Sequence, residues 1–90
     1  MTEEQNIKKL TLGKTAEEAL EVLNEVLKKD SDNAALLIER GKLFWRLNRR
    51  GDALSDYEKA AQIAPESPAS LLLEHSYSIM SFFNPDILNP

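Results

Sequence analysis

The chain has 90 residues, of which 42% are hydrophobic and 29% charged, and its formal net charge is −4. This length corresponds to one small domain of ordinary globular composition. With only three glycines and four prolines, the chain favours helices over a turn-rich β fold. The absence of cysteine excludes disulfides, thiolate metal sites and cysteine nucleophiles. The negative charge argues against general binding of nucleic acid.

The N-terminal sequence has none of the features of a secretory signal. The segment MTEEQNIKKL has acidic residues where a signal peptide has a basic region, and no apolar run follows it. No stretch approaches the roughly 20 apolar residues of a membrane-spanning helix. We therefore expect a soluble, cytoplasmic protein without membrane contact.

Helical patterns follow in chain order, and the first strong one lies at residues 15–29. Before it, residues 3–10 contain only two apolar positions, so residues 1–13 are expected to be a poorly defined segment or a short helix. Thr15 and Glu18 match a capping box, in which each side chain accepts a hydrogen bond from the other residue's backbone N–H. Apolar residues then recur at steps of three and four, which predicts an amphipathic helix with one buried stripe.

Three further helices are predicted. The first runs from about residue 33 to 48 behind an N-cap at Asp32 or Ser31, the second from about 52 to 64, and the third from 68 to about 83. The short connections between these helices predict stacked antiparallel hairpins.

The chain is similar to itself at an offset of 34 residues. At this offset Ala19 aligns with Ala53 and Leu20 with Leu54, and one offset serves two pairs of helices. A fixed period of this length is typical of helical repeats. The sequence resembles the tetratricopeptide repeat, a helix–turn–helix unit of 34 residues.

The resemblance covers about residues 14–83, with one full unit at 34–67 and a half unit on either side. The positions that carry it are Leu37, Gly41, Phe44, Ala53, Tyr57, Ala60 and Pro65. It implies an all-α fold in which antiparallel helix hairpins stack as a short right-handed solenoid, followed by a tail at residues 84–90. Arg40 departs from the pattern, because the family usually has leucine there. We expect Arg40 to reach the surface along its apolar stem, or the repeat to pack less deeply.

The resemblance also implies a concave groove lined by the first helix of each unit. In this sequence the groove positions are Ala35, Ile38, Lys42, Trp45, Arg46 and Arg49. The spacing of Ile38, Lys42, Trp45 and Arg49 independently defines a helical stripe apart from the core stripe. The cations could bind carboxylates, and the indole could supply an apolar anchor. The alternative is that Trp45 packs on a neighbouring helix and the cations are merely solvated.

The last predicted helix is apolar over about 240° of its circumference, whereas a helix that closes a solenoid should have a wide polar side. Three explanations are open: contact with a second copy, contact with another partner, or cover by the tail with Ile87 and Leu88. The residues expected to carry self-association as a homodimer are Leu72, Ile79, Met80, Phe82 and Phe83.

No pattern of catalytic residues stands out. The single histidine, His75, lies on the apolar helix without metal-ligand spacing or a nearby nucleophile, and no glycine-rich phosphate loop occurs. We expect no enzyme, no metal and no cofactor. The expected function is a protein–protein interaction module that binds an unidentified protein or peptide, an acidic one among the candidates. The partner-binding residues would be Ile38, Lys42, Trp45, Arg46 and Arg49.

Two alternatives remain open at this point. The first is a structural self-association module that acts through residues 71–83. The second, less favoured, is nucleic-acid contact through the basic cluster of residues 40–50, which would show a steep dependence of binding on salt.

Overall fold

The computed structural model describes the backbone of residues 3–83 and the side chains of residues 5–81, and its described part consists of helices and their connections. The five helices in this range are α1 (Glu3–Thr11), α2 (Ala16–Lys29), α3 (Ala34–Arg46), α4 (Arg50–Ile63) and α5 (Ala69–Phe83). The prediction of an all-α fold is therefore confirmed. The predicted tail at residues 84–90, with Ile87 and Leu88, lies outside the described residues.

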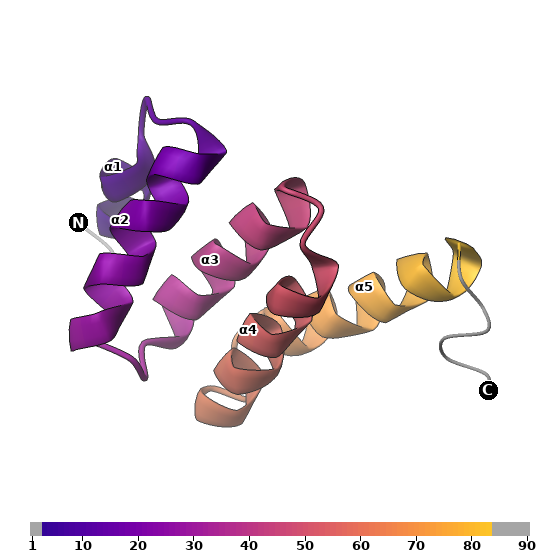
Figure 1. Cartoon of the computed structure of the whole chain (residues 1–90). Coiled ribbons are helices and arrows are strands. Elements are labelled where there is room, and N and C mark those ends of the chain that lie inside the picture. The colour runs from indigo at the N-terminus through magenta and orange to yellow at the C-terminus, as the bar shows by residue number, and fades with distance from the viewer. Residues whose placement is uncertain (1–2, 84–90) are drawn as a thin grey trace.

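Each helix packs on the next one along the chain, and α1 also contacts α3. Figure 1 shows α3 and α4 side by side in the middle of the molecule, with the α1–α2 pair on one side and α5 on the other. The C-terminal part of α5 extends beyond the other helices (Figure 1). Within the described part of the chain, no helix combines the length and the apolar content that a membrane crossing requires.

The start of α2 is the capping box that the sequence predicts. The Thr15 N–H donates to Glu18 Oε1 at 3.0 Å, and the Glu18 N–H donates to Thr15 Oγ1 at 3.2 Å. The weakly patterned segment before it does form a helix, α1. This helix is held on the core by Ile7, which is 5% exposed.

Two predicted helix boundaries are wrong. The N-cap of α3 is Asn33 rather than Asp32 or Ser31, because Asn33 Oδ1 accepts the N–H of Leu36 at 3.2 Å. Helix α3 also ends at Arg46 instead of continuing to residue 48. Asn48 takes a left-handed conformation with φ 65°, which asparagine tolerates better than most residues, so the chain turns there and α4 begins at Arg50.

The α3–α4 hairpin is closely packed where the sequence places small residues. An atom at the Cβ position of Gly41 would lie 2.5 Å from Cε1 of Tyr57, so the glycine leaves the space that the tyrosine ring fills. On α4, Ala53 and Ala60 are fully buried on either side of Tyr57. Leu37, which is 2% exposed, packs in the same core. The small residues thus allow the two helices to approach, as the sequence predicts.

Candidate functional site

A hollow between α3 and α5 brings together residues that the sequence assigned to two different surfaces. Its volume is about 420 Å³, and its lining includes Lys42, Trp45 and Arg46 of α3. Leu72 and Ile79 of α5 line the same hollow. The predicted groove stripe and part of the predicted self-association face therefore belong to one surface, which we call the α3–α5 hollow.

The α3–α5 hollow exists because α5 approaches α4 through small side chains. Ala69 is fully buried and Ser76, two turns later, is 5% exposed. The hollow is completed by Tyr57 of α4, together with Ser76 and the exposed His75 of α5. Sequence reasoning missed His75 as part of the lining. Its spacing of three residues from Leu72 is the signal that would have placed it there.

Trp45 is half-buried, and it contacts the first residue of α4. The guanidinium of Arg50 lies over the Trp45 ring, 5.1 Å from the ring centroid. A cation over an indole face is attracted by the ring quadrupole. Trp45 thus contacts α4 through Arg50 and also lines the hollow. The two alternatives given for this residue, packing on a neighbouring helix and lining a groove, therefore do not exclude each other.

The predicted groove continues from the α3–α5 hollow toward α1. A second hollow of about 330 Å³ is lined by Ala35, Ile38 and Lys42 of α3, together with Ile7 of α1 and Pro68. Lys42 lines both hollows. Ile38 is 7% exposed, so it belongs mainly to the core and contributes only its edge to this surface.

The structure places Arg49 apart from the other predicted groove residues. Its Nε donates to Asp52 Oδ2 at 2.8 Å, and its guanidinium lies over the Phe44 ring, 4.7 Å from the centroid. The helical spacing that put Arg49 in the stripe does not apply, because α3 ends at Arg46 and the chain turns before Arg49.

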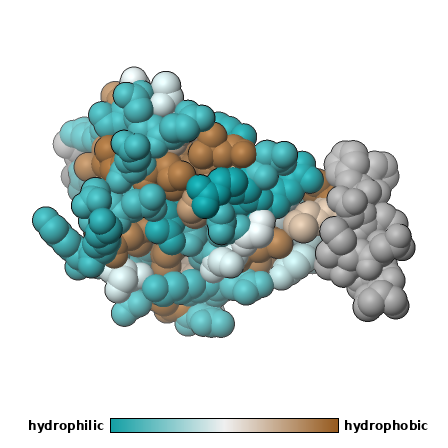
Figure 2. Space-filling model, viewed as in Figure 1, coloured by the Kyte–Doolittle hydropathy of each residue, from teal (hydrophilic) through white to brown (hydrophobic). Residues whose placement is uncertain are grey.

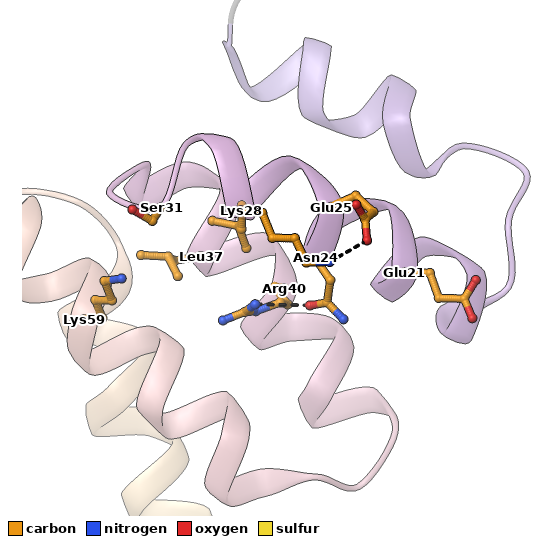
Figure 3. Close-up of a pocket in the computed structure, with 9 residues that line it drawn as sticks. Glu21, Asn24, Glu25, Lys28, Ser31, Leu37, Arg40 and Lys59 are labelled. Atoms are coloured by element: carbon orange, nitrogen blue, oxygen red, sulfur yellow. Dashed lines mark hydrogen bonds and ion pairs between the residues drawn. The ribbon is translucent and has the colours of Figure 1, made fainter.

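The basic cluster of residues 40–50 is not one patch, because Arg40 points to another part of the molecule. Its side chain borders a hollow of about 650 Å³ between α2, α3 and α4 (Figure 3). Arg40 Nη1 donates to Asn24 Oδ1 at 3.1 Å, and Nε and Nη2 donate to the two carboxylate oxygens of Asp56 at 2.8 and 2.7 Å. The hydrogen bonds to Asp56 raise the pKa of Arg40 further.

This network corrects the expectation for Arg40 and identifies two partners that the sequence did not predict. The Arg40 side chain is only 24% exposed, and it bridges three helices instead of extending into solvent. The charges around the large hollow are also nearly balanced. Lys28 pairs with Glu25 at 2.9 Å, and Lys59 lies 3.9 Å from Asp32. We therefore assign this hollow a structural role.

The remaining residues of the predicted self-association face lie outside the α3–α5 hollow. Met80 is half-buried and is not part of the lining. The side chains of Phe82 and Phe83 lie outside what the structure describes. Among the described side chains of α5, Leu71 is the most exposed apolar one, at 70%, and it is not part of the lining of the hollow.

The hydropathy of the surface does not single out one binding site. On the face shown in Figure 2, hydrophilic residues cover most of the surface and apolar residues show between them in several patches. Among the described residues, no three His, Asp or Glu side chains gather as a metal ion would need. We therefore take the α3–α5 hollow as the candidate binding site, because it combines an indole, aliphatic side chains and cations.

Comparison of the chain with models of known protein families, with curated proteins and with solved structures gives no match.

Proposed function

We propose that this protein is a non-catalytic interaction module of the tetratricopeptide-repeat type, which binds a peptide or protein segment in the α3–α5 hollow. The observation that carries the proposal is the meeting of Trp45 with Leu72 and Ile79 in one hollow, beside the side chains of Lys42 and Arg46. Aromatic and arginine side chains around an apolar pocket are typical of residues that dominate binding energy.

Two features support the repeat architecture behind this proposal. The 34-residue period places small residues at corresponding positions, and in the hairpin Gly41 lies against Tyr57 between the buried Ala53 and Ala60. The hollows also lie between alternate helices, α1 with α3 and α3 with α5. A right-handed solenoid with a concave face along α1, α3 and α5 accounts for both features.

The binding proposal is tested by selection from a random peptide library displayed on phage, with the full chain as target. Binding of the selected peptides is then measured through the fluorescence of Trp45, the single tryptophan. Ile79→Ser removes an apolar wall of the hollow and should weaken binding about tenfold, as expected for the loss of one buried aliphatic side chain. Leu71→Ser is the matched control at an exposed position of α5 outside the lining, and it should change the affinity less than about twofold.

Two results would contradict the binding proposal. One is a selection that enriches no peptide. The other is an equal loss of affinity in Ile79→Ser and Leu71→Ser, because the peptides would then bind α5 without using the hollow. Circular dichroism of both variants separates a lost binding surface from a lost fold.

Self-association is the second candidate function, favoured by the extension of α5 beyond the other helices (Figure 1). Light scattering over a concentration series measures the solution mass. Met80→Lys changes α5 outside the hollow, whereas Trp45→Ala changes the lining of the hollow and leaves α5 unaltered. A dimer that Met80→Lys dissociates and Trp45→Ala preserves supports assembly through α5, whereas a monomer at all concentrations contradicts it.

A further inference from the structure

Three arginine side chains lie over aromatic rings close to the turn between α3 and α4. Arg40 and Arg49 lie over the Phe44 ring, with their guanidinium carbons 5.5 and 4.7 Å from its centroid. Each of these two arginines also pairs with a carboxylate on α4, at 2.7 Å. Arg50 lies over the Trp45 ring at 5.1 Å, and it has no ion pair with any described residue. Arg50 therefore differs from the other two, because its ring contact is not combined with an ion pair.

Two features of Arg50 disfavour its position in the folded chain. Its Nε atom is buried, and no acceptor among the described residues takes the hydrogen. A buried donor without an acceptor costs folding free energy, more so on a charged group. Arg50 is also the first residue of α4, where the positive end of the helix dipole disfavours a cation. Residues that break such rules are expected at functional sites, so Arg50 calls for an explanation other than stability.

The ring that Arg50 covers belongs to the candidate binding site. Trp45 lines the α3–α5 hollow, whereas Arg50 is not part of that lining. The indole is half-buried and packs in part against the core, so the rest of the side chain is available to a ligand. A cation over one face of the ring favours the rotamer that keeps this contact. A side chain that is fixed before binding also loses less conformational entropy when a ligand arrives.

We propose that Arg50 is a positioning residue of the candidate site. Its guanidinium holds the Trp45 ring in the orientation that lines the α3–α5 hollow, so that a ligand meets an indole that is already in place. Arg50 acts through Trp45 and needs no contact with the ligand itself. The effect on affinity rests on the proposed function, whereas the effect on the Trp45 ring is measurable without any ligand.

The test without a ligand uses the indole N–H of Trp45, the single tryptophan, in the ¹⁵N-labelled full chain. The heteronuclear NOE of this group reports motion of the ring on the ps–ns timescale. Arg50→Gln removes the cation over the ring and should lower the NOE, because the ring then moves more freely. Arg50→Lys keeps a cation that can lie over the indole, so it should recover at least half of the difference.

Arg49→Gln is the matched control for Arg50→Gln. It removes the same charge from the neighbouring residue, whose guanidinium lies over Phe44 instead of Trp45. It also breaks the ion pair with Asp52, so a general loosening of the turn would appear in this variant too. We expect the Trp45 NOE to stay at the wild-type value in Arg49→Gln. In Arg50→Gln the NOE should fall while the melting temperature stays the same or rises, because an unpartnered buried donor is removed.

The consequence for binding is measured with a library-selected peptide that carries a fluorescent label, through the anisotropy of the label. Arg50→Gln should weaken binding about fivefold, in line with the cost of immobilising one side chain on binding. Arg50→Lys should lie between this variant and the wild type. Arg49→Gln should change the affinity less than about twofold, because its side chain lies apart from the hollow.

An unchanged Trp45 NOE in Arg50→Gln would overturn the proposal, as would an equal fall in both glutamine variants. A lower NOE together with unchanged or tighter peptide binding would overturn the role of Arg50 in the site. The outcome is separate from that of the peptide selection. If the selection enriches no peptide, the proposed function fails, and the NOE still decides whether Arg50 positions Trp45. If peptides bind and the NOE does not depend on Arg50, the hollow binds its ligand without this residue.

Discussion

Arg40 and the buried Asp56 form a bidentate ion pair between α3 and α4. Arg40 Nε lies 2.8 Å from Asp56 Oδ2, and Nη2 lies 2.7 Å from Oδ1. Asp56 is only 5% exposed, and Arg40 also donates to Asn24 Oδ1 at 3.1 Å. One side chain thereby joins α2, α3 and α4. The geometry is the bidentate arrangement in which arginine binds a carboxylate most strongly.

Removing one partner of this pair should destabilise the fold more than replacing both. Asp56→Ala leaves the guanidinium of Arg40 without its buried carboxylate, and we expect the free energy of unfolding to fall by about 2–4 kcal/mol. The double variant Arg40→Met with Asp56→Leu fills the same space with apolar side chains. It should recover at least half of that loss.

Urea unfolding followed by circular dichroism measures the free energy of unfolding of both variants. The two values are comparable when this free energy falls with urea concentration at a similar slope in both variants. The account of Arg40 would be contradicted if Asp56→Ala cost less than about 0.5 kcal/mol, the value typical of an exposed surface pair. It would also be contradicted if the double variant were less stable than the single one.

Two glycines in helices should respond oppositely to alanine. Gly41→Ala places a methyl group 2.5 Å from Cε1 of Tyr57, in a core where the ring has little room to move. Overpacking of this kind costs about 1–3 kcal/mol, against a gain of about 1 kcal/mol in helix propensity, so the net effect should be destabilising. Gly51→Ala, in the first turn of α4, meets nothing within 4 Å and should stabilise by about 0.5–1 kcal/mol.

Thermal unfolding of the two alanine variants provides the measurement. A rise in melting temperature for both variants would show that Gly41 is not at a close contact between α3 and α4. The double variant Gly41→Ala with Tyr57→Leu gives an internal check. The smaller leucine side chain should make the added methyl group less costly than it is beside tyrosine.

The hairpin contacts were predictable because they depend on local spacing. The 34-residue period and the small residues Gly41, Ala53 and Ala60 mark the places where helices approach, and the capping box marks the start of α2. Periodicity does not fix the ends of helices. The choice of Asn33 as N-cap and the left-handed turn at Asn48 depend on side-chain and backbone hydrogen bonds that several nearby residues could also make.

The candidate site was predictable only helix by helix. Helical spacing predicts the stripe with Lys42 and Trp45 on α3. It separately predicts the apolar face with Leu72 and Ile79 on α5. Their meeting in one hollow depends on how α5 packs on α4 through Ala69 and Ser76. That orientation is a tertiary property, so the two predictions remained separate.

Charged residues were the hardest to place from the sequence. The ion pair between Arg40 and Asp56 spans 16 residues, and nothing in the local pattern of either helix requires it. Arg49 was misplaced because the pattern was extended beyond the end of α3.

The capping box should make stability depend on pH in the acid range. Hydrogen bonds from the Thr15 backbone N–H and side chain lower the pKa of Glu18 below its usual 4.5. Because the folded-state pKa is the lower one, the stabilisation is present above about 4.5 and is lost as the pH falls through the folded-state value. Glu18→Gln keeps an acceptor without the charge, so its melting temperature should approach that of the wild type as the pH falls below 4.5. A difference that stays constant with pH would contradict this role for the Glu18 carboxylate.

A hydrogen bond between α5 and α4 should be visible in the titration of Tyr77. Its hydroxyl donates to Glu58 Oε1 at 2.8 Å, which raises the pKa of Tyr77 above its usual 10. This stabilisation is therefore present below pH 10 and is lost as the pH rises through the folded-state pKa. In a Tyr57→Phe background Tyr77 is the single tyrosine, and tyrosinate absorbance reports its ionisation. Glu58→Gln should lower the pKa of Tyr77 toward 10, whereas an unchanged titration would mean that the bond does not persist in solution.

The most direct test of the central claim is the footprint of a library-selected peptide on the ¹⁵N-labelled full chain. We expect amide shifts on α3 around Lys42, Trp45 and Arg46 together with shifts on α5 around Leu72 and Ile79, moving in parallel during one titration. Parallel shifts on both helices would mean that one ligand occupies the hollow between them. Shifts confined to α5, with none on α3, would contradict the account, because the α3–α5 hollow would then not be the binding surface.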